Sequence, residues 1–223
     1  MRILLGQPVM LIYTALMENK WLTYAKKLEA IASTGAHFGE SDFDLERYEE
    51  VREIAHQMLA DLGNVPVTVI SNLIPDYGSG YATPKTDVRG AVIRNNEILL
   101  VREKLDGKWT LPGGYADTGL SPASNICKEI AEEASLQVKA SKLYAVFHKA
   151  AHHYDADTRD FYKMYFLCEQ LDDASPAPGA ETLDAAFFPR DRLPELSTGR
   201  VIAPHIDLAF EFAAEPGRPT LFD

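Results

Sequence analysis

Cysteine and basic residues are both scarce in this chain. Only two of its 223 residues are cysteines, Cys127 and Cys168, which argues against a disulfide framework and fits the reducing cytoplasm. Lys and Arg number 22 against 33 Asp and Glu, so the formal net charge is −11. Because binding along nucleic-acid phosphates needs a basic surface, nucleic acid is not expected as a partner.

A long apolar run is missing as well. Residues 1–16, MRILLGQPVMLIYTAL, are apolar but too short for a membrane span, and Gln7 and Pro8 interrupt them. They also lack the clear cleavage site of a signal peptide. We therefore expect no membrane association. Two interpretations of this stretch stay open, an extra strand or arm, or a segment upstream of an original start at Met17.

The first third of the chain has a helical pattern. Apolar residues recur at helical spacing over residues 19–33 and 44–62, with Gly35 and Gly63 placed to end the two helices. A third, short helix is expected over residues 66–73, although its β-branched residues favour a strand. Pro and Gly residues then indicate a linker at 79–86. The pattern predicts a small all-helical N-terminal domain over residues 17–78, whose thin core favours docking or dimerisation.

Beyond the linker, the pattern over residues 87–223 is that of strands around a helix. Strands are expected at residues 88–93 and 98–101, joined by a tight turn at Asn95-Asn96. Further strands are expected at 137–147, 161–170 and 183–188, and a last helix at 205–213. The order of elements predicts an α+β fold.

The most informative segment is residues 113–136, GGYADTGLSPASNICKEIAEEASL. Ser121 and Pro122 fit the N-cap and first position of a helix that carries Glu129, Glu132 and Glu133 on one face. Carboxylates at these spacings repel one another, and a hard divalent cation would compensate them. A solvated acidic face is the alternative, and spacing alone favours it. The Gly-Gly turn just upstream shifts the balance, because glycines let backbone approach a ligand closely.

This segment resembles the Nudix box. In that motif Gly is followed after five residues by Glu, and after seven more by Arg-Glu-aliphatic-any-Glu-Glu-any-Gly-aliphatic. Gly114 stands at the first Gly, KEIAEE at the central part and Leu136 at the last position, with no insertion. Three positions depart from the motif: Leu120 replaces Glu, Lys128 replaces Arg and Ser135 replaces Gly. Lys128 lacks the planar fork of Arg, and Leu120 removes a carboxylate.

The likeness extends over most of the chain. The stretches KWLTYAKKLEAIASTGAHF, GYATPKTDVRGAVI and DGKWTLPGGYAD are similar to a Nudix subgroup with a helical N-terminal domain, which begins near Met17. The resemblance implies an α/β/α sandwich with a mixed sheet. It also implies a homodimer that hydrolyses the pyrophosphate bond of a small nucleotide substrate, a nucleoside diphosphate linked to another moiety. ADP-ribose and CDP-choline are typical substrates of the subgroup.

Site roles follow from the same resemblance. It implies that Glu129, Glu132, Glu133 and the Gly113 carbonyl bind Mg²⁺ or Mn²⁺. The implied catalytic residues are Glu132, Glu133, also a candidate general base, and Lys128, which would orient the glutamates or touch phosphate. The alternative hypothesis is a nucleotide-binding regulator that has lost turnover, motivated by the departures from the box. RNA processing by the same chemistry is disfavoured by the acidic charge.

Residues outside the central box are nominated for substrate binding. These are Arg89, Gly114, Tyr115 and His153. A solvated strand charge is an equally good interpretation of Arg89 and the better one of Arg102, and loop packing is the alternative for Tyr115. His148, His152, His153 and Tyr154 are expected near a loop before the strand at 161, either lining the substrate site or as simple loop residues. Asp155, Asp157 and Asp160 are interpreted as a solvated acidic loop, with a second metal site as the minority alternative.

Overall fold

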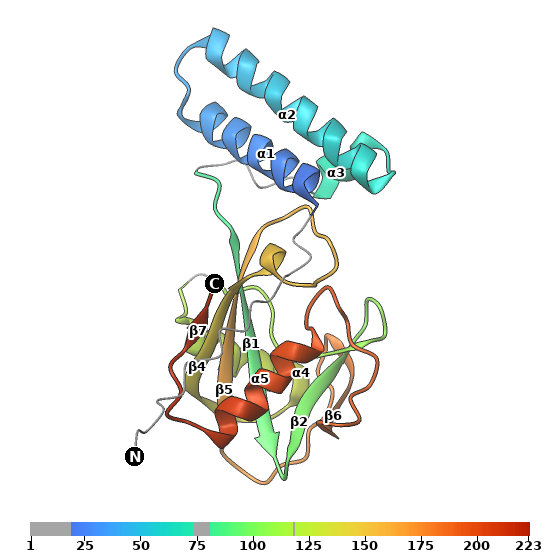
Figure 1. The fold of residues 1–223 in the computed structure, drawn as a ribbon, viewed down its shortest axis with the longest axis vertical. Helices are drawn as coiled ribbons and strands as arrows, with labels where there is room; N and C mark the ends of the chain where they lie inside the picture. Colours follow the sequence, from blue (N-terminus) through green and yellow to red (C-terminus); the bar gives the residue numbers. More distant parts are fainter. Residues whose placement is uncertain (1–18, 74–80, 118) are drawn as a thin grey trace, which may run out of the picture.

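A computed structural model describes residues 19–73, 81–117 and 119–223 (Figure 1). The expected arm at residues 1–16 lies outside the described residues, as do residues 79–80 of the expected linker. Within the described ranges, no helix is long and apolar enough to cross a membrane.

The N-terminal part consists of three helices. They are α1 (Lys20–Phe38), α2 (Asp42–Gly63) and α3 (Val67–Leu73). The side chain of Asn19 accepts a hydrogen bond from the Trp21 N–H at the start of α1, and Ser41 caps α2 in the same way. Asn64, in the left-handed conformation, ends α2 as its C-cap. The three predicted helices are therefore present.

The prediction that Gly35 ends the first helix is wrong. Helix α1 continues to Phe38, and Gly35 lies inside it against the ring of Tyr48 from α2. A Cβ atom at Gly35 would approach Tyr48 Cε1 to 2.2 Å. The glycine therefore allows close packing of two helices, a function that a single sequence cannot distinguish from a helix stop.

The helical segment has a small core and exposes several large apolar side chains. Among the described residues, its buried cluster consists of Leu22, Ala25, Leu59, Ala60 and Ile70. Many large apolar side chains remain exposed on it: Trp21, Tyr24, Ile31, Phe38, Phe43, Ile54, Leu62 and Val69. Four of these, at positions 21, 24, 31 and 38, follow one face of α1, since residues three and seven apart share a face.

The remainder of the chain forms a seven-stranded mixed sheet. Its strands are β1 (Lys85–Arg94), β2 (Glu97–Glu103), β3 (Trp109–Thr110), β4 (Val138–His148), β5 (Phe161–Gln170), β6 (Thr182–Pro189) and β7 (Leu221–Phe222). The order is β3-β2-β1-β5-β4-β7, with β6 paired to β2. The pairs β1–β5 and β4–β7 are parallel and the others antiparallel. Strand β1 includes the last two residues of the expected linker.

Two helices cover opposite faces of this sheet (Figure 1). Helix α4 (Pro122–Ala134) packs Ile126, Ile130 and Ala134 against Val88 and Val92 on one face. Helix α5 (Ala203–Ala214) packs Ile206 and Phe210, among others, on the other face. The expected α/β/α sandwich with a mixed sheet is confirmed. The predicted turn at Asn95-Asn96 is also present, and both residues have the positive φ of a type I′ hairpin.

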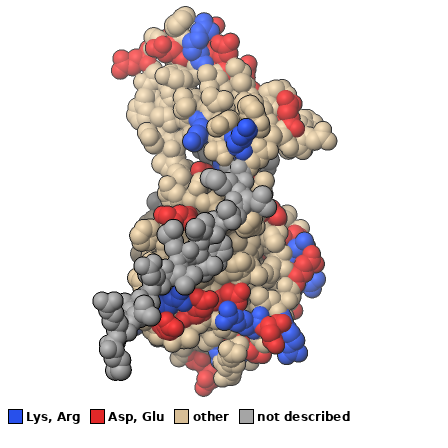
Figure 2. Space-filling model, in the orientation of Figure 1, with Lys and Arg blue, Asp and Glu red and all other residues tan. Residues whose placement is uncertain are grey.

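The helical segment lies at one end of the sheet (Figure 1). Lys26 Nζ of α1 lies 2.9 Å from Asp160 Oδ1, immediately before β5, and the Ala82 N–H donates to Thr34 Oγ1 at 3.1 Å. On the face shown in Figure 2, acidic and basic side chains are interspersed over both parts outside the grey residues. That arrangement is not the continuous basic surface typical of nucleic-acid binding.

Candidate active site

The Gly113–Gly114 turn is joined tightly to strand β1. Gly113 has φ of +134°, and a Cβ atom there would lie 2.0 Å from the Val88 carbonyl oxygen. The Val88 N–H donates to the Gly114 carbonyl at 2.9 Å, and the Gly90 N–H to the Pro112 carbonyl at 3.0 Å. Only glycine combines this conformation with so close an approach. The turn is therefore fixed in position beside the start of the sheet.

Glu133 and Glu129 of α4 meet this turn. Glu133 is buried and its Oε2 accepts the Gly113 N–H at 2.8 Å. Burial raises the pKa of Glu133 to about 7, with Glu129 adding to the increase and Arg89 opposing it. Burial also raises the pKa of Glu129, whose Oε2 would lie 3.3 Å from a Cβ at Gly114. The two carboxylates thus face the glycine turn from successive turns of one helix.

Both glutamates line a cavity of about 410 Å³, here called the glutamate cavity. Its charged lining residues are Asp87, Arg89, Glu103, Glu129, Glu133, Lys149, Asp155, Asp157, Arg159, Lys163, Glu181 and Arg200. A lining that combines carboxylates with cations suits a ligand that carries phosphates together with a metal ion. The volume falls in the range of ordinary small-molecule sites.

Glu132 does not line this cavity, although it shares the helix face in the sequence pattern. Its Oε2 lies 2.7 Å from Lys128 Nζ, and Lys128 also contacts Asp117 Oδ2 at 3.2 Å. These two carboxylates raise the pKa of Lys128. The structure therefore separates the three predicted ligands into a pair at the cavity and one paired with a lysine.

The donor set at the cavity fits a divalent cation. Among the described residues, no group of three or more His, Cys, Asp and Glu side chains is arranged to hold a metal ion. Mg²⁺ is commonly held by only one or two carboxylates together with substrate phosphates and waters. Glu129 and Glu133 supply that pair, and both line the cavity beside the glycine turn.

Arg89 is buried, so its interpretation as a solvated strand charge is wrong. Its guanidinium forms a bidentate pair with Asp87, with N···O distances of 2.9 and 2.8 Å, and donates to the Leu111 carbonyl at 3.1 Å. Lys163 Nζ lies 2.7 Å from Asp87 Oδ1 and completes the cluster. Burial lowers the pKa of Lys163 to about 8, while Asp87 opposes the shift. This cluster forms one wall of the glutamate cavity.

Tyr115 lies at the edge of the same cavity. Its ring stacks on Phe161 with centroids 5.8 Å apart and planes inclined by 6°, and the Arg159 guanidinium lies 5.8 Å from the Tyr115 centroid. About half of Tyr115 remains exposed. One part of the Tyr115 side chain is packed and the rest is exposed. Both interpretations of this residue, packing on the loop and stacking with a base, are compatible with this arrangement.

His152 and His153 of the loop, and His148 at the end of β4, do not line the glutamate cavity. His153 is exposed and lines a neighbouring cavity with His152 and Tyr154. His152 Nε2 lies 2.8 Å from Asp223 Oδ1, and His148 Nε2 lies 2.9 Å from Asp160 Oδ1. Among the acidic residues, Asp157 is half-buried and paired with Lys149 and Arg159, so the solvated-loop interpretation is wrong for it.

Three residues that support the site were missed in the sequence. Asp87 and Lys163 belong to the buried cluster, and Asn125, fully buried, accepts the Asp117 N–H and donates to carbonyls of the loop before α4. Asp87 stands two residues from Arg89, on the same face of a strand, which was a usable signal. Nothing in the sequence pattern indicated the partner strand that brings Lys163 to Asp87.

The departures from the box have local structural consequences. Ser135 ends α4 with φ of +56°, a conformation that glycine adopts at lower cost. Leu120 is an exposed residue, about half accessible, in the loop before the helix. Neither residue disturbs the packing of α4 on the sheet.

Known proteins resemble this chain over almost its whole length. The NUDIX domain family matches residues 84–207, and the family of UDP-X-like N-terminal oligomerisation domains matches residues 19–74. A putative ADP-ribose pyrophosphatase of Bacillus subtilis is 42% identical over 207 residues, covering 93% of this chain and 99% of the relative.

Two crystal structures support the same assignment. An ADP-ribose pyrophosphatase from Streptococcus suis is 37% identical with a TM-score of 0.57, covering 63% of this chain and 100% of its own. A UDP-X diphosphatase is 32% identical with a TM-score of 0.58, covering 92% of this chain and 98% of its own. The chain is thus a Nudix pyrophosphohydrolase with an N-terminal domain of the UDP-X-like oligomerisation family.

Proposed function

We propose that this enzyme hydrolyses the pyrophosphate bond of a nucleoside diphosphate linked to a second moiety, of the ADP-ribose or CDP-choline type, with Mg²⁺ or Mn²⁺. The observation that carries the proposal is the pairing of Glu129 and Glu133 at the glycine turn, inside a cavity that also presents buried cations. The relatives support the proposal, because the names ADP-ribose pyrophosphatase and UDP-X diphosphatase describe enzymes that act on molecules of this kind.

Different residues of the site serve different parts of this reaction. Glu129 and Glu133, with the Gly113 carbonyl, would hold a divalent cation, which when bound polarises phosphoryl oxygens and lowers the pKa of water. Glu133, buried at the glycine turn, is also the candidate for taking up a proton from the attacking water. Lys163 and Arg89 stabilise negative charge on the phosphates from the wall of the cavity.

Glu132 has a different role in this proposal. It keeps Lys128 beside Asp117 and thereby fixes the loop that precedes α4, and it joins the cation only if the ion pair opens. The catalytic role that the resemblance implies for Lys128 would depend on the same ion pair with Glu132. Glu132→Gln should therefore reduce activity less than Glu133→Gln.

The test measures phosphate-linked product release from ADP-ribose, CDP-choline, NADH and diadenosine polyphosphates with Mg²⁺ or Mn²⁺. We expect metal-dependent hydrolysis of at least one compound, and a fall of roughly 100-fold or more in kcat for Glu133→Gln. Glu53→Gln, at an exposed position of α2, is the matched control and should leave kcat unchanged. No turnover of any compound, with nucleotide binding retained in a thermal-shift assay, would contradict the proposal.

A regulator without turnover is the second candidate, and Leu120 is the observation that favours it. Leu120 occupies the position of a box glutamate and is exposed next to α4. Leu120→Glu separates the two candidates. An inactive natural protein that becomes active through this change would establish the regulator, whereas an active natural protein would exclude it.

We further propose that the oligomer expected from the N-terminal domain is a homodimer. The exposed stripe on α1, formed by Trp21, Tyr24, Ile31 and Phe38, supplies an apolar surface suited to a second copy. Ile31→Glu should convert a dimer to a monomer in light scattering, whereas Glu53→Gln should not. The cytoplasmic location expected from the two unpaired cysteines stays a prediction.

A further inference from the structure

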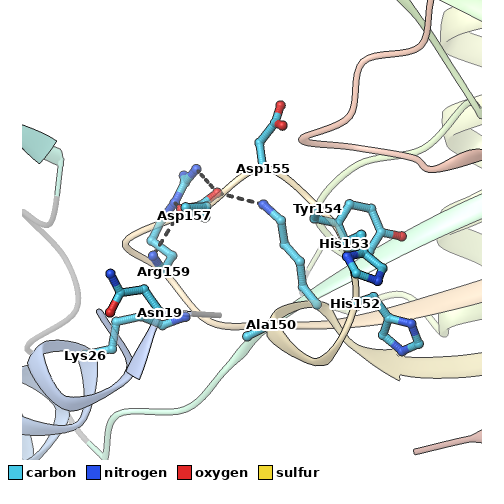
Figure 3. Close-up of a pocket in the computed structure, with 11 residues that line it drawn as sticks. Asn19, Lys26, Ala150, His152, His153, Tyr154, Asp155, Asp157 and Arg159 are labelled. Atoms are coloured by element: carbon cyan, nitrogen blue, oxygen red, sulfur yellow. Dashed lines mark hydrogen bonds and ion pairs between the residues drawn. The ribbon is translucent and has the colours of Figure 1, made fainter. Parts of the chain in front are cut away.

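The loop formed by residues 149–159 lines two cavities. One is the glutamate cavity, and the other, of about 290 Å³, lies between this loop and the start of α1 (Figure 3). We call the second one the interdomain cavity. Asn19 and His153 line the interdomain cavity but not the glutamate cavity, and both are exposed. A ligand can therefore enter the interdomain cavity from solvent without passing through the glutamate cavity.

The lining of the interdomain cavity is basic, although the chain has a net charge of −11. Its charged residues are three cations and two carboxylates: Lys26, Lys149, Arg159, Asp155 and Asp157. Lys149 and Arg159 both contact the carboxylate of Asp157, with N···O distances of 3.0 Å each (Figure 3). The Asp155 carboxylate accepts a hydrogen bond from Thr198 Oγ1, outside this lining, at 2.8 Å. An anion in the cavity therefore meets more positive than negative charge.

The cations of this lining are held in position. Lys149 is buried, and Lys26, which is also largely buried, lies 2.9 Å from Asp160 Oδ1. Since these side chains are already ordered, binding a ligand costs them little further conformational entropy. Ammonium and guanidinium groups donate charge-assisted hydrogen bonds to phosphate oxygens, and the Asn19 amide and the His153 imidazole offer neutral donors. The lining thus suits a phosphate group better than a neutral or cationic ligand.

We propose that the interdomain cavity is a regulatory site that binds the phosphate group of a phosphate monoester, separately from the substrate. Hydrolysis of a pyrophosphate bond with a substituent on each side yields two phosphate monoesters, so the products of the reaction carry this group. The site would then report the accumulation of product. The regulatory effect rests on the proposed function, whereas the binding of phosphate does not. Inorganic phosphate has the same chemistry, and the experiment below separates the two sources.

The wall shared by the two cavities supplies the coupling. Lys149, Asp157 and Arg159 line both of them. A phosphate group in the interdomain cavity would compete with Asp157 for the two cations and draw their charge away from the glutamate cavity. The phosphates of the substrate would then be stabilised less in the transition state, so occupation of the interdomain cavity inhibits hydrolysis. This coupling needs no passage between the cavities, because the shared side chains transmit it.

Ala150 allows the site to be tested, because it lines the interdomain cavity but not the glutamate cavity. Ala150→Glu adds a negative charge there, and Ala150→Gln is its matched control of the same shape. Binding to the full chain is followed through the imidazole signals of His153 in two-dimensional NMR spectra, without divalent cations and at constant pH and ionic strength. The probes are inorganic phosphate, ribose 5-phosphate and AMP, with ribose as the control that lacks phosphate. Thermal unfolding shows that both variants are folded before they are compared.

The binding measurement has a defined expected result. The His153 signals should shift with the phosphate probes but not with ribose, while those of His37, in the last turn of α1, stay unchanged. Affinity for these probes should fall roughly 10-fold or more in Ala150→Glu, because like charges repel, and should be retained in Ala150→Gln. No shift of His153, or equal affinity in both variants, would overturn the site. Tighter binding of inorganic phosphate than of either monoester would overturn the product as the source.

Steady-state kinetics tests the regulatory effect on any substrate that the natural enzyme hydrolyses. We expect the phosphate probe that binds most tightly to lower kcat in the natural enzyme and in Ala150→Gln, and this inhibition to be lost in Ala150→Glu. Inhibition that only raises KM and persists in Ala150→Glu would place the inhibitor in the glutamate cavity and overturn the regulatory role. If the natural enzyme hydrolyses no compound of the panel, the proposed function fails, while the NMR measurement still decides whether the interdomain cavity binds phosphate.

Discussion

The sheet and the helical segment differ in how completely they bury their own surfaces. The sheet has apolar clusters of thirteen and twelve buried residues on its two faces, whereas the helical segment has one cluster of five. A small core supplies little stability by itself, so we expect the helical segment to depend on contacts beyond its own core, such as those with the sheet.

Buried charged groups are paired in both parts. In the sheet, the Asp87 carboxylate accepts from Arg89 and Lys163. In the helical segment, Glu29 Oε2 lies 3.0 Å from His56 Nε2, and burial raises the pKa of Glu29. The helical segment therefore differs from the sheet in the size of its apolar core rather than in the pairing of its buried charges.

The largest expected effect concerns the turn on which the sheet part depends. Gly113→Ala would force a Cβ atom against the Val88 carbonyl at a φ of +134°, so unfolding in urea should show a loss of about 3 kcal/mol or more. Gly217→Ala is the matched control, because a Cβ there meets nothing within 4 Å. A loss below 1 kcal/mol at Gly113 would mean that the turn adapts to a side chain at this position.

The second effect is a pH dependence of the free energy of unfolding that arises in the sheet part. Burial lowers the pKa of His205 to about 3 from its usual 6.5, with His152 and Lys163 adding to the shift. The stabilising contribution of neutral His205 is therefore complete above pH 6.5 and is lost as the pH falls toward 3. Between pH 6.5 and 5 it should account for about 2 kcal/mol. His205→Gln should remove this part of the pH dependence in urea unfolding, and His37→Gln, in the last turn of α1, should not.

The third effect concerns the contact between the two parts. Lys26→Met removes the ion pair with Asp160, which is partly exposed, so the loss should be only about 0.5–1 kcal/mol. Hydrogen exchange should increase in residues 149–160 and in α1, while the core strands remain protected. A double-mutant cycle with Asp160→Asn measures the pair itself. Unchanged exchange in the loop would show that α1 does not hold it.

The smallest expected effect is on the stability of the sheet part, at the end of α4. Ser135 has a positive φ without being glycine, so Ser135→Gly should stabilise the protein by about 0.5–1 kcal/mol. Gly217→Ala again serves as the control, because it exchanges glycine and alanine at a position where the Cβ atom meets nothing within 4 Å. Thermal unfolding provides the measurement. A destabilisation by Ser135→Gly would indicate that the serine side chain makes a contact worth more than the strain.

The order and type of the longer elements were predictable, because they follow from local patterns. The N-cap at Ser121, Pro122 and the Asn95-Asn96 turn act within a few residues, and the three N-terminal helices follow apolar spacing. Gly35 was misread because its neighbour Tyr48 belongs to another helix. Local rules therefore predicted the longer elements, but not the short strands β3 and β7 or every boundary.

The sequence by itself determined which side chains can share a helix face, and it identified Glu129, Glu132 and Glu133 as a group. Only the tertiary structure decided that Glu133 is buried at the Gly113 turn while Glu132 pairs with Lys128. Helical periodicity fixes the directions of side chains, whereas burial and pKa depend on which other element covers them. The buried partners of Arg89 and the cavity between α1 and the loop have the same origin, since they arise where distant segments meet.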